Sequence, residues 1–144
     1  MATKLTPLKQ QRGSALLEAL IAILIFSMGI IALMGLQAAS IKNSIDAKYR
    51  ADASYLVNQI IGQMWVDRAN LDGYAHNPTA GAVCAPGGTA STNANVTSWL
   101  NQFTTSASSS FLPGATSAKQ QISVTTPLAN TRQVKVTVCW KGPQ

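Results

Sequence analysis

Acidic residues, histidine and cysteine are scarce in this chain of 144 residues, and proline is missing from a long stretch of it. There are five acidic residues, one histidine and two cysteines, and residues 73–144 contain no acid at all. The chain has no CxxC pair and no G-x-S-x-G nucleophile motif. These absences leave no catalytic constellation, so we expect a protein that is not an enzyme and that holds no metal and no cofactor.

The few polar residues that remain as candidates are isolated from one another. His76 lies in a Gly/Asn/Pro segment without ligand residues nearby, and we expect it to be a solvated loop histidine. Asp67 and Asp72 flank the end of a predicted helix and have no third acid for a cation site. We expect both to be solvating charges, and Trp65, Trp99 and Trp140 to be core or interface residues.

The net charge of +6 overstates how basic the chain is. Three of the eleven basic residues lie before Ser14, so the remainder carries eight basic and five acidic residues. A nucleic-acid surface needs clustered lysines and arginines with interleaved aromatic residues, and no such cluster is present. We therefore do not expect a nucleic-acid partner.

A basic leader followed by a long apolar run opens the chain. Residues 1–13 carry Lys4, Lys9 and Arg12 and end at Gly13, and one acid, Glu18, then precedes eighteen uncharged residues, 19–36. The 23 residues 14–36 are long enough to span a bilayer, and the basic leader would stay in the cytoplasm. The sequence thus predicts a single-pass membrane anchor with the rest of the chain outside.

This junction resembles the class III signal of type IV prepilins and pseudopilins. The resemblance implies that a prepilin peptidase cuts after Gly13 and methylates the new amine of Ser14, which makes Glu18 the fifth residue of the mature chain. Ser14 departs from the Phe or Met that is common at this position. The residues that carry the match are Arg12, Gly13, Ser14, Leu16, Leu17, Glu18, Ala19, Leu20, Ile21, Ala22, Ile23, Leu24 and Ile25.

A carboxylate in an apolar helix is costly, by about 2.5–3.5 kcal/mol at the bilayer centre. Cleavage would create a positive amine on Ser14, one helical turn before Glu18 and on the same face. In a filament Glu18 would meet the amine of a neighbouring subunit, which would fix the axial register and favour assembly. The alternative is that Glu18 only caps the start of the helix, near the positive end of its dipole.

Apolar residues with helical spacing continue past the anchor, which predicts one helix from about Ser14 to about Asn70, stopped by Asp72-Gly73. Residues 73–95 read as a surface loop. A short helix capped by Thr97 or Ser98 follows, resuming at Phe111-Leu112 and ending at Pro113-Gly114. The apolar stripe of the long helix comprises Ile41, Ile45, Tyr49, Ala53, Leu56, Ile60 and Met64, widened by Val57, Ile61 and Trp65.

The C-terminal region alternates apolar and polar residues as a β-hairpin does. Ile122 and Val124 lie on one strand, residues 127–130 form the turn, and the second strand runs from Val134 to Trp140 with its valine face on the helix. We therefore predict an α+β, type IV pilin-like fold: a long N-terminal helix packed on a small antiparallel sheet. The expected parts are the leader 1–13, the hydrophobic helix 14–40, its amphipathic continuation 41–72 and a globular region 73–144.

Cys84 and Cys139 both lie in the part predicted to be exported, where an oxidising periplasm favours a disulfide. The two cysteines are 55 residues apart, and closing a loop of this length would stabilise the fold by about 4 kcal/mol in the chain-entropy model. Two free structural thiols are the alternative.

Beyond the anchor the chain resembles the PilV-type minor pilins of the type IV pilus. The features that carry this resemblance are residues 29–37, the segment from Trp99-Leu100 to Pro113-Gly114, and the closing strand from Val134 to Trp140. The resemblance implies a low-copy subunit that primes assembly near the pilus tip. Its partners would be the prepilin peptidase, other minor pilins, the major pilin and the inner-membrane assembly machinery.

Two other functions fit the same sequence. One is a minor pseudopilin of type II secretion, and the other is a tip-borne adhesin or DNA-contacting subunit. In each case the chain would begin in the inner membrane, with its C-terminal region in the periplasm, and a pilus subunit would then reach the cell surface.

Overall fold

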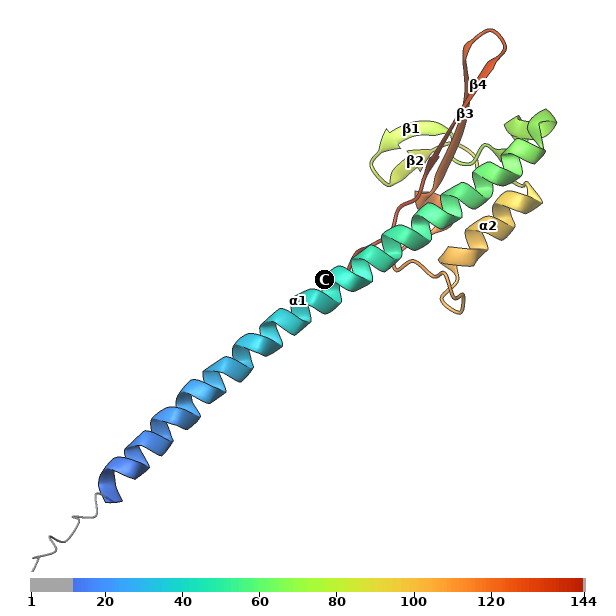
Figure 1. Cartoon of the computed structure of the whole chain (residues 1–144). Coiled ribbons are helices and arrows are strands. Elements are labelled where there is room, and N and C mark those ends of the chain that lie inside the picture. The colour runs from blue at the N-terminus through green and yellow to red at the C-terminus, as the bar shows by residue number, and fades with distance from the viewer. Residues whose placement is uncertain (1–11, 144) are drawn as a thin grey trace, which may run out of the picture. The chain divides into compact units, whose positions relative to one another are not determined.

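The computed structural model describes residues 12–143, so the predicted leader up to residue 11 lies outside the described residues. The chain divides into two compact units, with the boundary between Ile41 and Lys42. The first unit contains one helical segment, and the second contains all the strands (Figure 1). The fold is α+β, as predicted.

Helix α1 is Arg12–Val66, and it is followed by a 3-10 helix, η1, at Arg68–Tyr74. The long proline-free stretch permits this length, because no residue lacks the N–H that the helical ladder needs. The predicted end near Asn70 was too late. The Asp67 carboxylate accepts hydrogen bonds from the Asn70 amide (2.7 Å) and the Tyr74 hydroxyl (3.3 Å), and such local side-chain bonds compete with the α-helical pattern.

A small antiparallel pair occupies the region that was predicted to be only a loop. Strand β1 is Thr79–Ala82 and β2 is Ala85–Gly87. A Cβ placed on Gly81 would lie 2.2 Å from the Ala85 carbonyl oxygen, so only glycine fits this close approach. The pair is too short to give an alternating pattern, and this explains why it was missed.

Helix α2 is Ala94–Thr104, and it begins earlier than predicted. Asn93, not Thr97 or Ser98, is its N-cap, and its side chain accepts a hydrogen bond of 2.8 Å from the Asn95 N–H. The predicted helical resumption at Phe111-Leu112 was wrong, because those two residues form coil instead.

The predicted C-terminal hairpin is present, with β3 at Gln121–Leu128 and β4 at Thr131–Thr137. A short 3-10 helix, η2 at Ser117–Lys119, precedes it. The turn is shorter than predicted, because Pro127 lies within β3 and Asn130 takes a left-handed conformation with φ of 66°. Strand β4 ends at Thr137, so the predicted second strand from Val134 to Trp140 is paired with β3 only as far as Thr137. Its valines Val134, Val136 and Val138 are half-buried against the core.

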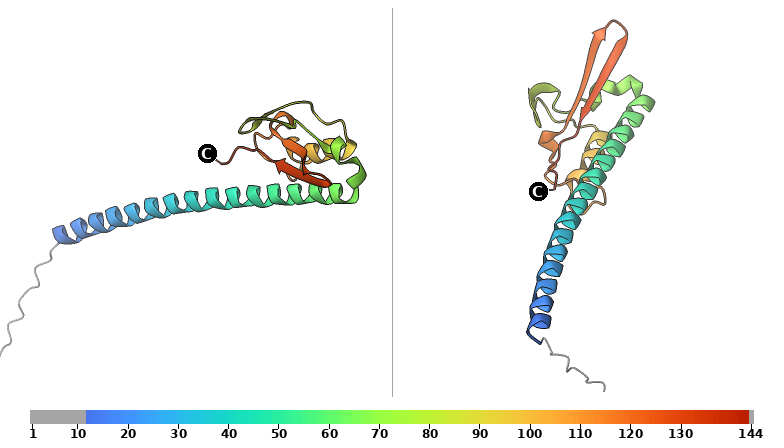
Figure 2. Two further views of the ribbon diagram at one scale, coloured as in Figure 1. Left: turned by 90° about the horizontal axis from the view of Figure 1, so that it is seen from above. Right: turned by 60° about the vertical axis from the view of Figure 1, so that its left-hand side comes forward.

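The core of the second unit forms where α1 meets α2 and the hairpin. The indole N–H of Trp99 donates a hydrogen bond of 2.8 Å to the Leu56 carbonyl, and the Trp99 and Phe103 rings pack edge to face at 4.9 Å. Helix α2 lies alongside the last turns of α1 in both views of Figure 2. The buried residues are Ala53, Leu56, Ile60 and Met64 from α1, Val96, Trp99, Leu100 and Phe103 from α2, and Tyr74, Leu112, Ala115 and Ile122.

Replacing Leu56 by alanine should destabilise the second unit by about 2–5 kcal/mol, because its side chain is fully buried and leaves a cavity. Leu128→Ala is the matched control, since Leu128 is 70% exposed at the hairpin end and should cost less than about 0.5 kcal/mol. Urea unfolding of the full chain in detergent, followed by near-ultraviolet circular dichroism, measures both. Equal midpoints for the two variants would contradict this core assignment.

Candidate functional site

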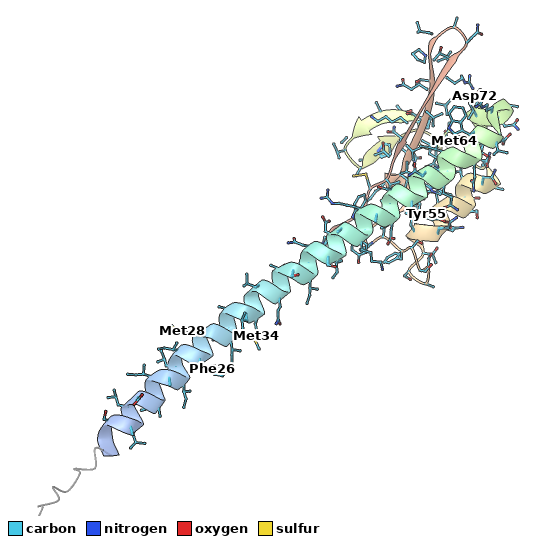
Figure 3. All side chains as sticks on the ribbon, viewed as in Figure 1. Phe26, Met28, Met34, Tyr55, Met64 and Asp72 are labelled. Atoms are coloured by element: carbon cyan, nitrogen blue, oxygen red, sulfur yellow. A yellow bond between two sulfur atoms is a disulfide. The ribbon has the colours of Figure 1, made fainter. Side chains whose placement is uncertain are left out.

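The first unit presents a helical surface that is apolar on every side. All side chains from Ser14 to Ile41 are exposed, and by length and composition this helix is able to cross a membrane. Figure 3 marks Phe26, Met28 and Met34, whose side chains project from α1 and are 63–70% exposed. Apolar surface of this extent is unstable in water and needs lipid or other apolar helices around it.

Glu18 is the single carboxylate of that surface. It is exposed, and it lies four residues after Ser14, so the two residues share one helix face. The Gly13–Ser14 peptide bond lies in the first turn of α1, because the helix begins at Arg12. That turn contains no acid. Cleavage at Gly13, methylation of Ser14 and the register role of Glu18 stay predictions.

The disulfide joins Cys84 to Cys139, with 5.6 Å between their Cα atoms. Cys84 lies in the turn between β1 and β2, in a left-handed conformation with φ of 60°. Cys139 follows β4 and is buried. The disulfide therefore links the β1–β2 pair to the segment that follows the hairpin.

Gln120 holds the backbone on the Cys139 side of the disulfide, and sequence reasoning missed it. Its side chain is fully buried. The amide oxygen accepts a bond of 2.8 Å from the Cys139 N–H, and the amide nitrogen donates to the carbonyls of Cys139 (3.1 Å) and Thr116 (2.9 Å). Nothing in the sequence distinguishes this glutamine from the exposed ones, because its partners lie in other segments.

His76 is not the solvated loop residue that was predicted, because it is only 1% exposed. Its Nδ1 accepts a hydrogen bond of 3.1 Å from the Ser91 N–H, so the ring proton belongs on Nε2, which donates to the Ser117 carbonyl at 2.9 Å. Asn77 beside it donates to the carbonyls of Ser117 and Gln120. The two side chains thus replace regular backbone pairing in an irregular segment.

Charged and aromatic side chains gather near the end of α1. Arg68 lies over the exposed ring of Trp65, 4.2 Å from its centroid. Asp72 is exposed, as expected of a solvating charge, and it also forms an ion pair with Arg132 of β4. Trp65 is exposed, whereas Trp99 is buried. Within residues 12–143, no three side chains of His, Cys, Asp or Glu group closely enough to hold a metal ion.

Comparison with known proteins does not place the chain in a family, since no family model, curated protein or solved structure matches it. The structure establishes a pilin-like architecture: a membrane-capable N-terminal helix, then small antiparallel sheets and a disulfide. The candidate site is therefore the exposed apolar helix with its single carboxylate, Glu18.

Gln120→Leu should destabilise the second unit by about 1–3 kcal/mol, because it leaves the buried N–H and carbonyl of Cys139 without their partner. Gln133→Leu, at an exposed position of β4, is the matched control and should change little. Urea unfolding of the oxidised chain measures the difference. A stability for Gln120→Leu equal to that of the control would show that the amide network is dispensable.

Proposed function

We propose that this chain is a minor subunit of a type IV pilus, anchored in the inner membrane before it joins the filament. The observation that carries the proposal is the helical surface of residues 14–41, which is apolar all round and contains one carboxylate, Glu18. An ordinary anchor has no need of a charge so close to its start. A subunit that leaves lipid to pack against neighbouring helices can use such a charge to form an ion pair.

The free energy of removing this apolar surface from water is favourable both in lipid and in a filament. Each Leu, Ile or Phe side chain removed from water contributes about 1.5–3 kcal/mol, whether lipid or another helix covers it. Moving the helix from lipid to a filament therefore costs little apolar burial. Glu18 distinguishes the two places, because a carboxylate without a partner is unfavourable in lipid and gains an ion pair beside a neighbour's amine.

Processing and location follow from this proposal. A prepilin peptidase would cut after Gly13, and the methylated amine of Ser14 would keep its positive charge. The remaining partners would be other minor pilins, the major pilin and the inner-membrane assembly machinery. The second unit would face the periplasm and later the cell surface, which suits the Cys84–Cys139 bond because disulfides persist in oxidising compartments.

A minor pseudopilin of type II secretion would have the same anchor and the same processing. Deleting the gene distinguishes the two, because a pilus subunit's loss removes surface pili whereas a pseudopilin's loss retains secreted proteins in the periplasm. We assign the chain no catalytic role.

The first expected result concerns processing. In cells that have their prepilin peptidase, the mature chain should begin at Ser14 and carry one added methyl group. Cells that lack the peptidase should contain the full-length chain. Intact mass spectrometry of the purified chain measures this, and a chain cut near Ala39 in both strains would mean an ordinary secretory signal and would overturn the proposal.

The second concerns Glu18. Glu18→Ala should leave cleavage largely intact but lower the amount of subunit in sheared pili by about tenfold or more, which corresponds to losing an interaction of at least about 1.4 kcal/mol. Asp52→Ala, which removes a carboxylate from the same helix within the second unit, is the control and should not affect incorporation. Normal amounts of Glu18→Ala in the pili would refute the register role.

A further inference from the structure

The hairpin is a sheet of two strands, so no other strand covers either of its outer edges. The two strands β3 and β4 form a sheet of their own, separate from β1 and β2 (Figure 1). The outer edge of β3 is bonded at one point, where the N–H and carbonyl of Ile122 exchange hydrogen bonds of 2.9 and 3.0 Å with His76. The backbone groups of Ile122 therefore point away from β4.

That observation fixes the direction of the other backbone groups, because they alternate along an antiparallel pair. Ile122 faces Val136, and Val124 faces Val134. In these pairs each residue turns its N–H and carbonyl outward, away from the opposite strand. Val134 and Val136 thus direct their backbone groups to the outer edge of β4, where no backbone partner meets them among residues 12–143. An edge of this kind is a template for another strand.

Two hollows lie between α1 and the C-terminal segment of the chain, one beside β4 and one beside the residues that follow it. One of about 610 Å³ lies between the end of α1 and residues 130–134, and the other, of about 510 Å³, lies between α1 and the pair Val138 and Trp140. No residue of β3 lines either hollow: β4 residues line the first, and the segment after β4 lines the second. The α1 residues that line them include a single stripe at helical spacing, and Arg68 of η1 follows at its end. The stripe consists of Arg50, Ser54, Val57, Ile61 and Trp65.

The length of this stripe matches that of a strand. From Arg50 to Trp65 the α-helix rises about 23 Å, and seven residues of extended chain span about 23 Å. The middle of the stripe is apolar, with Val57 and Ile61 beside the buried row of Leu56 and Ile60. This surface therefore combines outward-facing backbone groups of β4 with apolar side chains of α1.

We propose that an extended segment of another protein adds to the outer edge of β4 as a third strand and lies on this stripe of α1. Backbone hydrogen bonds to Val134 and Val136 would give affinity, and apolar side chains at alternate positions would fill the two hollows. The inference goes beyond the proposed function and does not depend on it, because the surface belongs entirely to the second unit.

The charges indicate that the incoming strand is acidic. Residues 73–144 contain four basic residues and no acid. Arg68 at one end of the stripe stacks on Trp65, and no carboxylate of the described residues forms an ion pair with it. A carboxylate on the incoming strand would pair with Arg68. A second copy of this chain fits poorly, because two β4 strands would bring Lys135 of each copy together, whereas Arg132 is already paired with Asp72.

Selection from a library of random octapeptides tests the proposal, with the full chain in detergent micelles as the target. The selected peptides should alternate apolar and polar residues and should be enriched in Asp or Glu. Val134→Pro should weaken their binding by about tenfold, because proline removes one outward N–H that the hairpin itself does not use. Val124→Pro is the matched control, since it removes the equivalent N–H from the opposite edge and should leave affinity unchanged.

A second variant keeps the test independent of any strain that proline introduces. Arg68→Glu changes an exposed side chain, and the peptides selected on it should be enriched in Lys or Arg instead. Unchanged charge preference, equal loss in Val124→Pro and Val134→Pro, or the absence of any binder below about 1 mM would each overturn the proposal. Self-association of the full chain that Val134→Pro abolishes would also overturn it, in favour of a second copy as the occupant.

Discussion

The constraint on which this molecule depends is that α1 satisfies its own backbone hydrogen bonds over 55 residues. A helix that does so can have any side-chain surface, because no N–H or carbonyl within it needs water. The chain uses this freedom in two ways. From Ser14 to Ile41 the surface is apolar on all sides, whereas from Tyr49 onward one row of residues is buried and the rest faces solvent.

The second unit is small for a stable domain, and it compensates for this with polar contacts and one covalent bond. Its core draws on α1, α2, the hairpin and a few residues of the connecting segments, so the apolar surface that it buries is limited. Buried amide and imidazole groups of His76, Asn77 and Gln120 hold the irregular segments in place, each through hydrogen bonds to backbone atoms far away in sequence. Satisfied polar groups of this kind give the domain one specific arrangement, since no alternative pairing would serve all of them.

The elements that could be predicted from the sequence are those with a strong local pattern. The absence of proline and the spacing of Ala53, Leu56, Ile60 and Met64 predicted α1 and its buried row, and alternating valines predicted the hairpin. The disulfide followed from the predicted compartment. The end of α1 was misplaced because Asp67 bonds locally to Asn70, an effect of side-chain geometry that periodicity does not contain.

The residues that could not be predicted depend on contacts between distant segments. His76 looked solvated because its neighbours in sequence are Gly, Asn and Pro, yet its ring bonds to Ser91 and Ser117. Gln120 acts through Cys139, nineteen residues later. Of the candidate site, the apolar surface and the position of Glu18 were evident from the sequence, whereas the open edge of β4 required the register of the hairpin.

The position of the disulfide has a consequence for the order in which the domain matures. Cys84 precedes α2 and the hairpin, whereas Cys139 follows β4. The disulfide therefore cannot form until every described strand has been synthesised. By then the Cys139 backbone, to which the Gln120 side chain bonds, is also present. A chain that has not yet formed this bond therefore carries two free thiols, and the number of free thiols distinguishes immature from mature molecules.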